Sequence, residues 1–251
     1  MNSDSGVRLE CDGPVATVTL CRPDVLNAQT PEMWRTLRNF SRELTGDVRV
    51  VLVKGEGRAF SAGLDRAVLT GTDFTDLAAL PDDEAVDRIA FFQDAFTWLR
   101  RPDLITIAAV QGHAIGAGFQ LALNCDLRIL ADDAKLTMAE VTLGLVPDLG
   151  GTKRLVELVG YARALEICTT ARRIPAPEAA ALGLANLVVP LADLDSAARD
   201  LAAAVLSSNR DAVIEIKALL SGAADRSYAE ADRAEREAQV RRLRELFQER
   251  R

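Results

Sequence analysis

Residues 104–118 read LITIAAVQGHAIGAG, a continuous apolar run that is followed by a glycine-rich turn. The run over 104–110 is short enough to be one buried strand of a parallel sheet. The turn leads into FQLAL at 119–123, which is typical of a helix. A strand, a glycine-rich turn and a helix in this order indicate one unit of an α/β core.

Strands and helices alternate on both sides of this stretch. A Gly-Pro turn joins two strands near the N-terminus, and Thr30-Pro31 is typical of a helix start, with proline at the first helical position. The alternation predicts an α/β fold with right-handed crossovers. The predicted strands are 7–12, 15–21, 48–53 and 127–130, and the predicted first helix ends at Gly46.

Two regions depart from this regular order. Residues 70–83 hold Gly, Thr, Asp and Pro with little periodicity, which predicts a loose loop before a helix whose apolar face lies over 86–99. From about Gly150 the pattern changes to helices alone. We therefore expect an α/β core over 1–190 and a C-terminal helical region over 191–251.

The last helix and the composition limit the partners that are expected. The tail over 227–251 is polar with a thin apolar stripe, a pattern that often packs on a partner subunit. The net charge of −7 disfavours a general nucleic-acid or anionic-membrane surface. No apolar run is long enough to cross a bilayer, and the N-terminus lacks a signal-peptide pattern. The four cysteines form no CxxC pair and there is one histidine, so we expect no metal site and a cytoplasmic location.

Two glycine-rich loops are candidate oxyanion sites. Residues 57–65, GRAFSAGLD, and residues 112–118, GHAIGAG, each follow a predicted buried strand. Small residues let the backbone approach a ligand, and the amides at a helix start are unpaired. Two such loops can place two N–H donors on one oxygen. The alternative is that each loop is only a tight turn.

A third stretch, AEVTLGLVPDLGGT at 139–152, carries two carboxylates among apolar and glycine residues. Such surroundings disfavour the charged form of a carboxyl group and raise its pKa towards values useful in acid–base catalysis. Glu140 and Asp148 are therefore candidate catalytic residues. The alternative is that Glu140 caps a turn and Asp148 caps the helix that follows.

Taken together, these three stretches resemble the enoyl-CoA hydratase/isomerase (crotonase) superfamily, as do Arg22-Pro23 and Leu26-Asn27-Ala28. The resemblance implies a crotonase-like spiral of repeated ββα units with a C-terminal helical trimerisation region. It implies an acyl-CoA thioester substrate, with coenzyme A entering as part of that substrate and no separate cofactor. It also implies a homotrimer, or a hexamer built from two trimers.

Motif position assigns roles to single residues. The resemblance implies oxyanion donors at the amides of Leu64 and Ala117. The coenzyme A site would include the carbonyl of Ala62 and the segment around Leu26 on the adenine, with Arg66 beside Asp65 as a candidate near the phosphates. Residues implied to line the ligand site are Leu26, Ala28, Ala62, Asp65, Arg66, Gly116 and Gln120.

The chain departs from the pattern of the family's hydratases, which use two glutamates. One matches Glu140, but Gln120 stands at the position of the other, and glutamine cannot exchange a proton. Asp148, eight residues after Glu140, resembles the dienoyl-CoA isomerase branch, and Pro147-Asp148 resembles a ring-epoxide isomerase branch. We therefore expect double-bond isomerisation. The alternatives are a hydratase that uses Glu140 alone and an acyl-CoA-binding protein without turnover.

Overall fold

The structure is a computed structural model that describes residues 5–44 and 46–248. Its large sheet has six strands in the order β1-β2-β3-β4-β6-β9. β1 and β2 form an antiparallel hairpin, and all later neighbours in the sheet are parallel. The strands are β1 (Val7–Asp12), β2 (Val15–Leu20), β3 (Val50–Gly55), β4 (Ile105–Val110), β6 (Leu127–Ala131) and β9 (Leu187–Val189).

A second, smaller sheet gives the chain its spiral course. It has the order β5-β7-β8, with β5 (His113–Ile115), β7 (Lys135–Thr137) and β8 (Ile174–Pro175). β4 is followed by β5 and then by α5 (Ala117–Asn124), and β6 is followed by β7 and then by further helices. Each turn thus adds a strand to each sheet and then a helix. The predicted α/β fold of repeated ββα units is confirmed.

Local sequence signals predict the start of one helix correctly but miss another helix. Thr30 caps α1 (Pro31–Glu43), because its Oγ1 accepts from the amide of Met33 at 3.3 Å, as predicted. The loose loop predicted for 70–83 is wrong, since α3 (Thr72–Ala78) occupies half of it. Leu77 of α3 packs against the main core, so a tertiary contact supports a helix that has no clear periodicity of its own.

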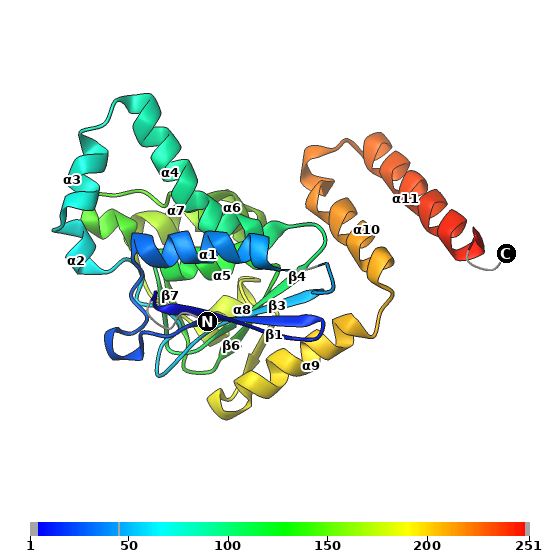
Figure 1. The fold of residues 1–251 in the computed structure, drawn as a ribbon, viewed down its shortest axis with the longest axis horizontal. Coiled ribbons are helices and arrows are strands. Elements are labelled where there is room, and N and C mark those ends of the chain that lie inside the picture. The colour runs from blue at the N-terminus through cyan, green and yellow to red at the C-terminus, as the bar shows by residue number, and fades with distance from the viewer. Residues whose placement is uncertain (1–4, 45, 249–251) are drawn as a thin grey trace.

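Two further expectations need correction. In α4 (Asp82–Thr97) the apolar face is buried only from Phe92 onward, while Val86 is 63% exposed. Figure 1 accordingly shows α3 and the start of α4 projecting from the body of the molecule. The region after Gly150 is also not helical throughout, because β8 and β9 complete the two sheets.

The remaining helices follow the spiral. They are α2 (Arg66–Leu69), α6 (Gly151–Val159), α7 (Tyr161–Thr170) and α8 (Ala176–Ala181). Short 3-10 turns lie at Pro23–Val25, Trp98–Arg100, Glu140–Leu143, Leu191–Asp193 and Ala223–Asp225.

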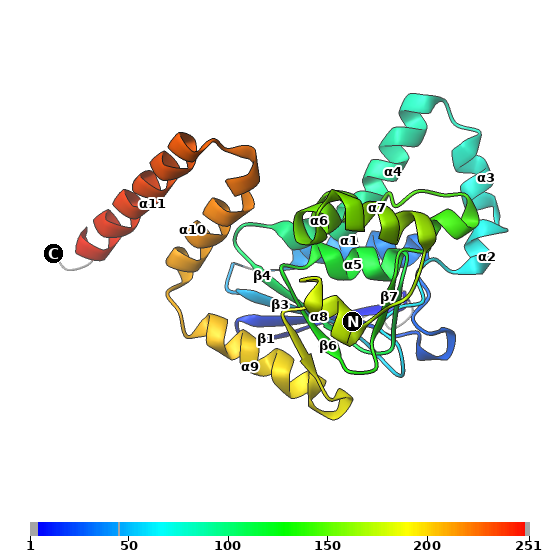
Figure 2. The same ribbon diagram turned by 180° about the vertical axis from the view of Figure 1, so that it is seen from behind.

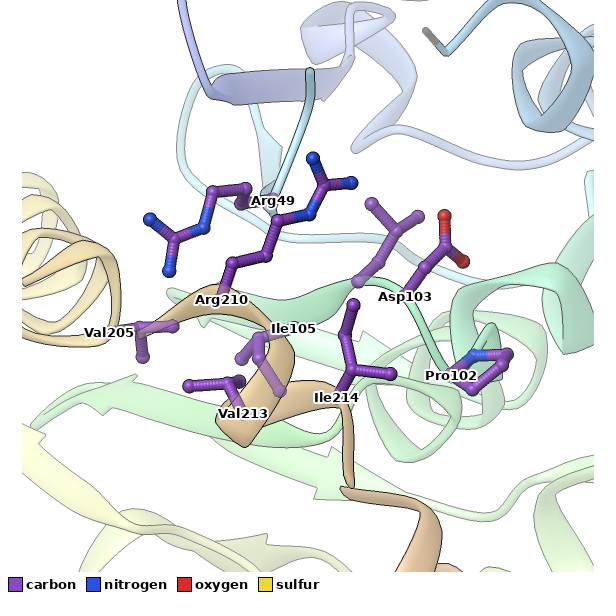
Figure 3. A pocket seen from close by; sticks show the side chains of 9 residues that line it. Arg49, Pro102, Asp103, Ile105, Val205, Arg210, Val213 and Ile214 are labelled. Carbon is purple, nitrogen blue, oxygen red and sulfur yellow. The ribbon is translucent and has the colours of Figure 1, made fainter. Parts of the chain in front are cut away.

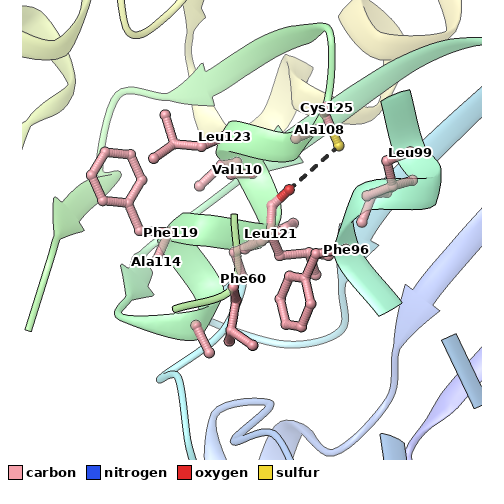
Figure 4. Close-up of a cluster of buried hydrophobic side chains, with 14 of the residues drawn as sticks. Phe60, Phe96, Leu99, Ala108, Val110, Ala114, Phe119, Leu121, Leu123 and Cys125 are labelled. Atoms are coloured by element: carbon pink, nitrogen blue, oxygen red, sulfur yellow. Dashed lines mark hydrogen bonds between the residues drawn. The ribbon is translucent and has the colours of Figure 1, made fainter. Parts of the chain in front are cut away.

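The main core surrounds α5, whose eight residues are all buried. Phe60, Phe96 and Phe119 fill the space between this helix and its neighbours, as Figure 4 shows. The Cys125 thiol lies 3.7 Å from the carbonyl oxygen of Leu121 in the same cluster, and burial raises the pKa of that thiol to about 12. Because α5 is enclosed, the turn that precedes it has a fixed position in the fold.

The C-terminal helices leave the core in two steps. α9 (Leu194–Leu206) covers the opposite face of the large sheet through a second apolar cluster. α10 (Arg210–Ser221) and α11 (Tyr228–Gln248) then extend away from the sheets, as Figures 1 and 2 show from opposite sides. Lys217 joins α10 to the core, because its Nζ lies 2.6 Å from the Leu104 carbonyl and 2.8 Å from Asp126 Oδ2.

No helix in the described part of the chain is long and apolar enough to cross a membrane.

Candidate active site

The two glycine-rich loops lie directly against each other. They follow the carboxyl ends of β3 and β4, which are parallel neighbours in the large sheet. The Ser61 amide donates to the carbonyl of His113 at 2.8 Å, and the Ile115 amide donates back to Ser61 at 3.0 Å. These backbone hydrogen bonds hold the two loops in register. Clefts beside the carboxyl ends of parallel strands are the usual place for a ligand.

Gly63 is required at the closest point between the loops. Its φ of +83° is favourable for glycine, and a Cβ there would lie 2.4 Å from the Ile115 carbonyl oxygen. The same Cβ position is 3.5 Å from the amide nitrogen of Ala117. The segment that carries Leu64 therefore runs beside the start of α5.

The structure leaves the amides of Leu64 and Ala117 without a backbone partner among the described residues. The amide of Gln29 donates to the Gly63 carbonyl, and the amide of Asp65 donates to the Gln29 carbonyl. The Leu64 amide, which lies between these two hydrogen bonds, takes part in neither. Ala117 is the first residue of α5, where a helix has no internal acceptor for the N–H. Two amides without a backbone acceptor thus lie on adjacent loops.

The third predicted stretch brings Glu140 next to Gln120. Gln120 is fully buried on α5, and its Nε2 donates to Glu140 Oε1 at 2.6 Å. Its Oε1 accepts from the amides of Leu149 at 2.9 Å and Gly151 at 3.3 Å. The other oxygen of Glu140, Oε2, is buried and has no hydrogen-bond partner within the described chain. The carboxyl group also faces Gly116, where a Cβ would be 3.2 Å from Oε1.

Both carboxyl groups of this stretch have raised pKa values. Burial is the main cause for Glu140, and the nearby charge of Asp148 raises its pKa further, while backbone amide hydrogen bonds and the hydrogen bond from Gln120 oppose the rise. Burial also raises the pKa of Asp148. Asp148 does not cap α6, since Gly150 is the residue at that position and no side chain caps the helix. The helix-cap alternative for Asp148 is therefore wrong.

The N-terminal candidates lie at the other end of the first loop. The Ala62 amide donates to the Leu26 carbonyl at 2.8 Å, which places these two residues together. Leu26 and Asn27 both have positive φ, of 55° and 54°, a conformation rarely adopted by residues other than glycine. Ala28 is buried beside them. The predicted adenine segment is thus a strained turn.

Asn27 is a structural residue of this turn for which the sequence suggested no role. Its Nδ2 donates to the carbonyls of Glu56 and Ala59, both at 2.8 Å, and its Oδ1 accepts from the Arg22 amide at 2.8 Å. These bonds stabilise the positive φ angles. A polar residue inside a motif can signal such a role, but its partners cannot be read from the sequence.

Asp65 and Arg66 differ in their surroundings. Asp65 Oδ2 accepts from Arg22 at 3.0 Å, and its Oδ1 caps α2 through the Ala67 amide at 3.1 Å. The Asp65 side chain is therefore engaged with the protein itself. Arg66 is exposed at the start of α2.

A small cavity elsewhere in the molecule is distinct from this site. Figure 3 shows side chains that line it, among them Arg49, Asp103, Ile105, Arg210 and Val213. It lies where β3 and β4 begin, at the opposite end of the strands from the two glycine-rich loops. Its volume of about 10 Å³ suits at most one water molecule.

Known proteins resemble this chain over nearly its whole length. The family model described as enoyl-CoA hydratase/isomerase matches residues 10–250. A probable enoyl-CoA hydratase of Mycobacterium bovis is 34% identical over 232 residues, which cover 89% of this chain and 84% of the relative. A short-chain-enoyl-CoA hydratase of Clostridium acetobutylicum is 33% identical over 206 residues, covering 81% and 76%. The crystal structure of a Thermobifida fusca YX protein in complex with acetoacetyl-CoA has a TM-score of 0.92 and 48% identity, covering 96% of both chains.

Proposed function

Because the chain belongs to the enoyl-CoA hydratase/isomerase family and is an enzyme of that family, we propose that it moves the double bond of an unsaturated acyl-CoA thioester. The observation that carries the proposal is the pairing of two half-buried carboxyl groups, Glu140 and Asp148, both with raised pKa values. An isomerase needs one group to remove a proton and one to return it.

The proposed reaction starts from a 3-enoyl thioester. Oε2 of Glu140 takes a proton from the carbon beside the thioester carbonyl, and the electron pair of that C–H bond enters the conjugated system. The negative charge that forms on the thioester oxygen is stabilised by the amides of Leu64 and Ala117. Asp148 supplies a proton at the far carbon or positions the acid that does so. The product is a 2-enoyl thioester of unchanged composition, and proton exchange resets the two carboxyl groups.

We propose that the coenzyme A part binds along the first loop. The Thermobifida fusca protein was crystallised with acetoacetyl-CoA, and its similarity supports a coenzyme A thioester as the ligand here. In the proposed pose, Ala62, Leu26 and Ala28 contact the adenine, and Arg66 is available to the phosphates. Asp65 supports this site by holding Arg22 and α2 in place. A ligand complex with the thioester oxygen more than ~3.5 Å from both oxyanion amides would contradict the pose.

The named relatives favour a second candidate, hydration of a 2-enoyl thioester with Glu140 alone. Glu140 is common to both reactions, whereas Gln120 and Asp148 support isomerisation. A third candidate is binding without turnover. Two half-buried carboxyl groups argue against it, because their desolvation costs free energy and a pure carrier has no need of them. Incubation with 2-enoyl, 3-enoyl and dienoyl thioesters, with products identified by mass and absorbance, separates the three. Hydration adds the mass of water, isomerisation adds nothing, and a carrier leaves every substrate unchanged.

We also propose a homotrimer or a hexamer of two trimers. The support is the exposed apolar surface of the C-terminal helices, which a monomer would leave in water. Leu220 on α10 is 71% exposed, and Val240, Leu243 and Leu246 on α11 are each more than 40% exposed.

A further inference from the structure

The orientation of the Gln120 side chain is decided by the backbone around it. Its Oε1 accepts from two amides, those of Leu149 and Gly151. The reverse orientation would point the NH2 group at these two N–H donors, leaving three donors facing one another without an acceptor. The NH2 group must therefore point at Glu140, at the observed 2.6 Å.

This arrangement makes the two oxygens of Glu140 unequal. Oε1 is taken by a donor that cannot accept a proton, whereas Oε2 is buried and without a partner in the described chain. A buried oxygen without a hydrogen bond costs free energy, so its presence in the fold calls for an explanation such as a catalytic role. At 2.6 Å the contact is direct, and no water molecule lies between the Gln120 amide and the carboxyl group.

We propose that Gln120 is a positioning residue that determines which reaction occurs: it holds Glu140 as a carboxylate and leaves Oε2 as the proton acceptor, while its amide denies hydration a second acid. The inference rests on the proposed isomerisation. Addition of water needs a bound water beside Glu140 and a group able to give or take a proton at that water. Gln120 occupies the neighbouring position and exchanges no proton.

Three other groups lie near the same carboxyl group. Asp148 raises the pKa of Glu140, and the Cys168 thiol on α7 lies close enough for the charge of Glu140 to raise the pKa of the thiol. Gly116, which also lies beside this carboxyl group, presents no side chain. Gln120 thus favours the ionised form of Glu140 together with the backbone amides of Glu140 and Ala139, against burial and against a neighbouring negative charge.

Two substitutions test this role. Gln120→Met removes the donor at similar volume, and Gln120→Glu replaces it with an acid. A hydrogen bond to a charged group is worth about 1.5–3 kcal/mol. The acidic limb of the turnover profile should therefore move about 1–2 pH units upward in Gln120→Met, with turnover recovering at higher pH. Gln120→Glu should show a similar upward shift from like-charge repulsion, and should gain measurable hydration of a 2-enoyl thioester.

Gln111→Met is the matched control, because Gln111 is also a buried amide but donates to Gly55 and Gly57 away from the carboxyl pair. Its acidic limb should stay at the wild-type pH. If Gln120→Met and Gln120→Glu lower turnover equally at every pH without moving the limb, Gln120 only fills space and the proposal is overturned.

A second readout does not depend on turnover. The infrared carboxyl band of Glu140, assigned by subtracting the Glu140→Gln spectrum, gives the titration midpoint directly. A higher midpoint in Gln120→Met than in the wild type supports the positioning role even if no thioester is isomerised, in which case the proposed function alone fails. An unchanged midpoint in an enzyme that does isomerise overturns the role of Gln120 and leaves the proposed function standing.

Discussion

Gln93 on α4 donates from Nε2 to the backbone carbonyl of Asp148 at 2.6 Å. This bond joins a helix from the middle of the chain to the turn that carries the second carboxyl group. The turn is also tied to α5, because Gln120 accepts from the amide of Leu149. Asp148 is therefore held from both sides by contacts to its own backbone and to its neighbour, while its side chain caps no helix.

Glu140→Gln should lower turnover by about two to four orders of magnitude, which is the usual contribution of a general base. Binding of the product thioester should remain nearly unchanged, since the amides of Leu64 and Ala117 are unaffected. Turnover and the dissociation constant are measured on the same preparations. Glu32→Gln, the same change on the exposed side of α1, should behave as wild type. A similar loss in both variants would mean that the assay reports stability.

Asp148→Asn should impair isomerisation of 3-enoyl and dienoyl thioesters more than any residual hydration, because the proposed isomerisation uses Asp148 to return a proton, whereas the hydration candidate uses Glu140 alone. The two rates are measured separately for each substrate. Wild-type rates on every isomerisation substrate would remove Asp148 from the mechanism. Hydration with Glu140 alone would then be the leading function.

Asp148→Asn should also raise the melting temperature near pH 7. Burial raises the pKa of Asp148 in the folded protein, so the folded state binds its proton more tightly than the unfolded chain does. Stability from this group is therefore present at low pH and lost as pH rises through the raised pKa. Asparagine carries no charge to desolvate, so the gain should shrink on acidification and vanish near the unfolded pKa of about 3.9.

Asp103→Asn is the control, for which the expected change in melting temperature at pH 7 has the opposite sign. The hydrogen bond from Arg101 lowers the pKa of Asp103, so this carboxylate contributes stability above its unfolded pKa. Its replacement should lower the melting temperature at pH 7, with the difference disappearing in acid. A lower melting temperature for Asp148→Asn than for the wild type at pH 7 would contradict the prediction, because it would show that the fold stabilises the Asp148 carboxylate.

The assembly prediction concerns the apolar face of α11. Leu243→Glu places a charge on a surface that we expect a partner subunit to cover, so it should reduce the mass measured by light scattering. Gln239→Glu adds the same charge to an exposed polar position of the same helix and should leave the mass unchanged. A clean monomer mass for the wild type at micromolar concentration would contradict the trimer.

The sequence predicts those elements whose signals are local. The strand predicted from the apolar run at 104–110 and the helix start predicted from Thr30-Pro31 are both present, because burial and capping depend on residues that are close in the sequence. The helix at Thr72–Ala78 was not predictable in this way, since the contact of Leu77 with the core supports it.

The candidate site shows the same limit. The sequence identifies Glu140, Asp148 and Gln120 by type and spacing. The sequence does not reveal the orientation of the Gln120 side chain, because that orientation depends on the amides of Leu149 and Gly151, which are far along the chain. Nor does it reveal that Gln93 supports the backbone of Asp148. Long-range hydrogen bonds of this kind become visible only when the fold has brought the segments together.

The most direct test of the proposed isomerisation is the product formed from one 3-enoyl thioester in water enriched in oxygen-18. The account predicts a 2-enoyl thioester of unchanged mass with no oxygen-18, formed by the wild type and largely lost in Glu140→Gln. A wild-type enzyme that leaves the 3-enoyl thioester unchanged, yet converts the 2-enoyl thioester into a hydroxyacyl product carrying oxygen-18, would contradict it.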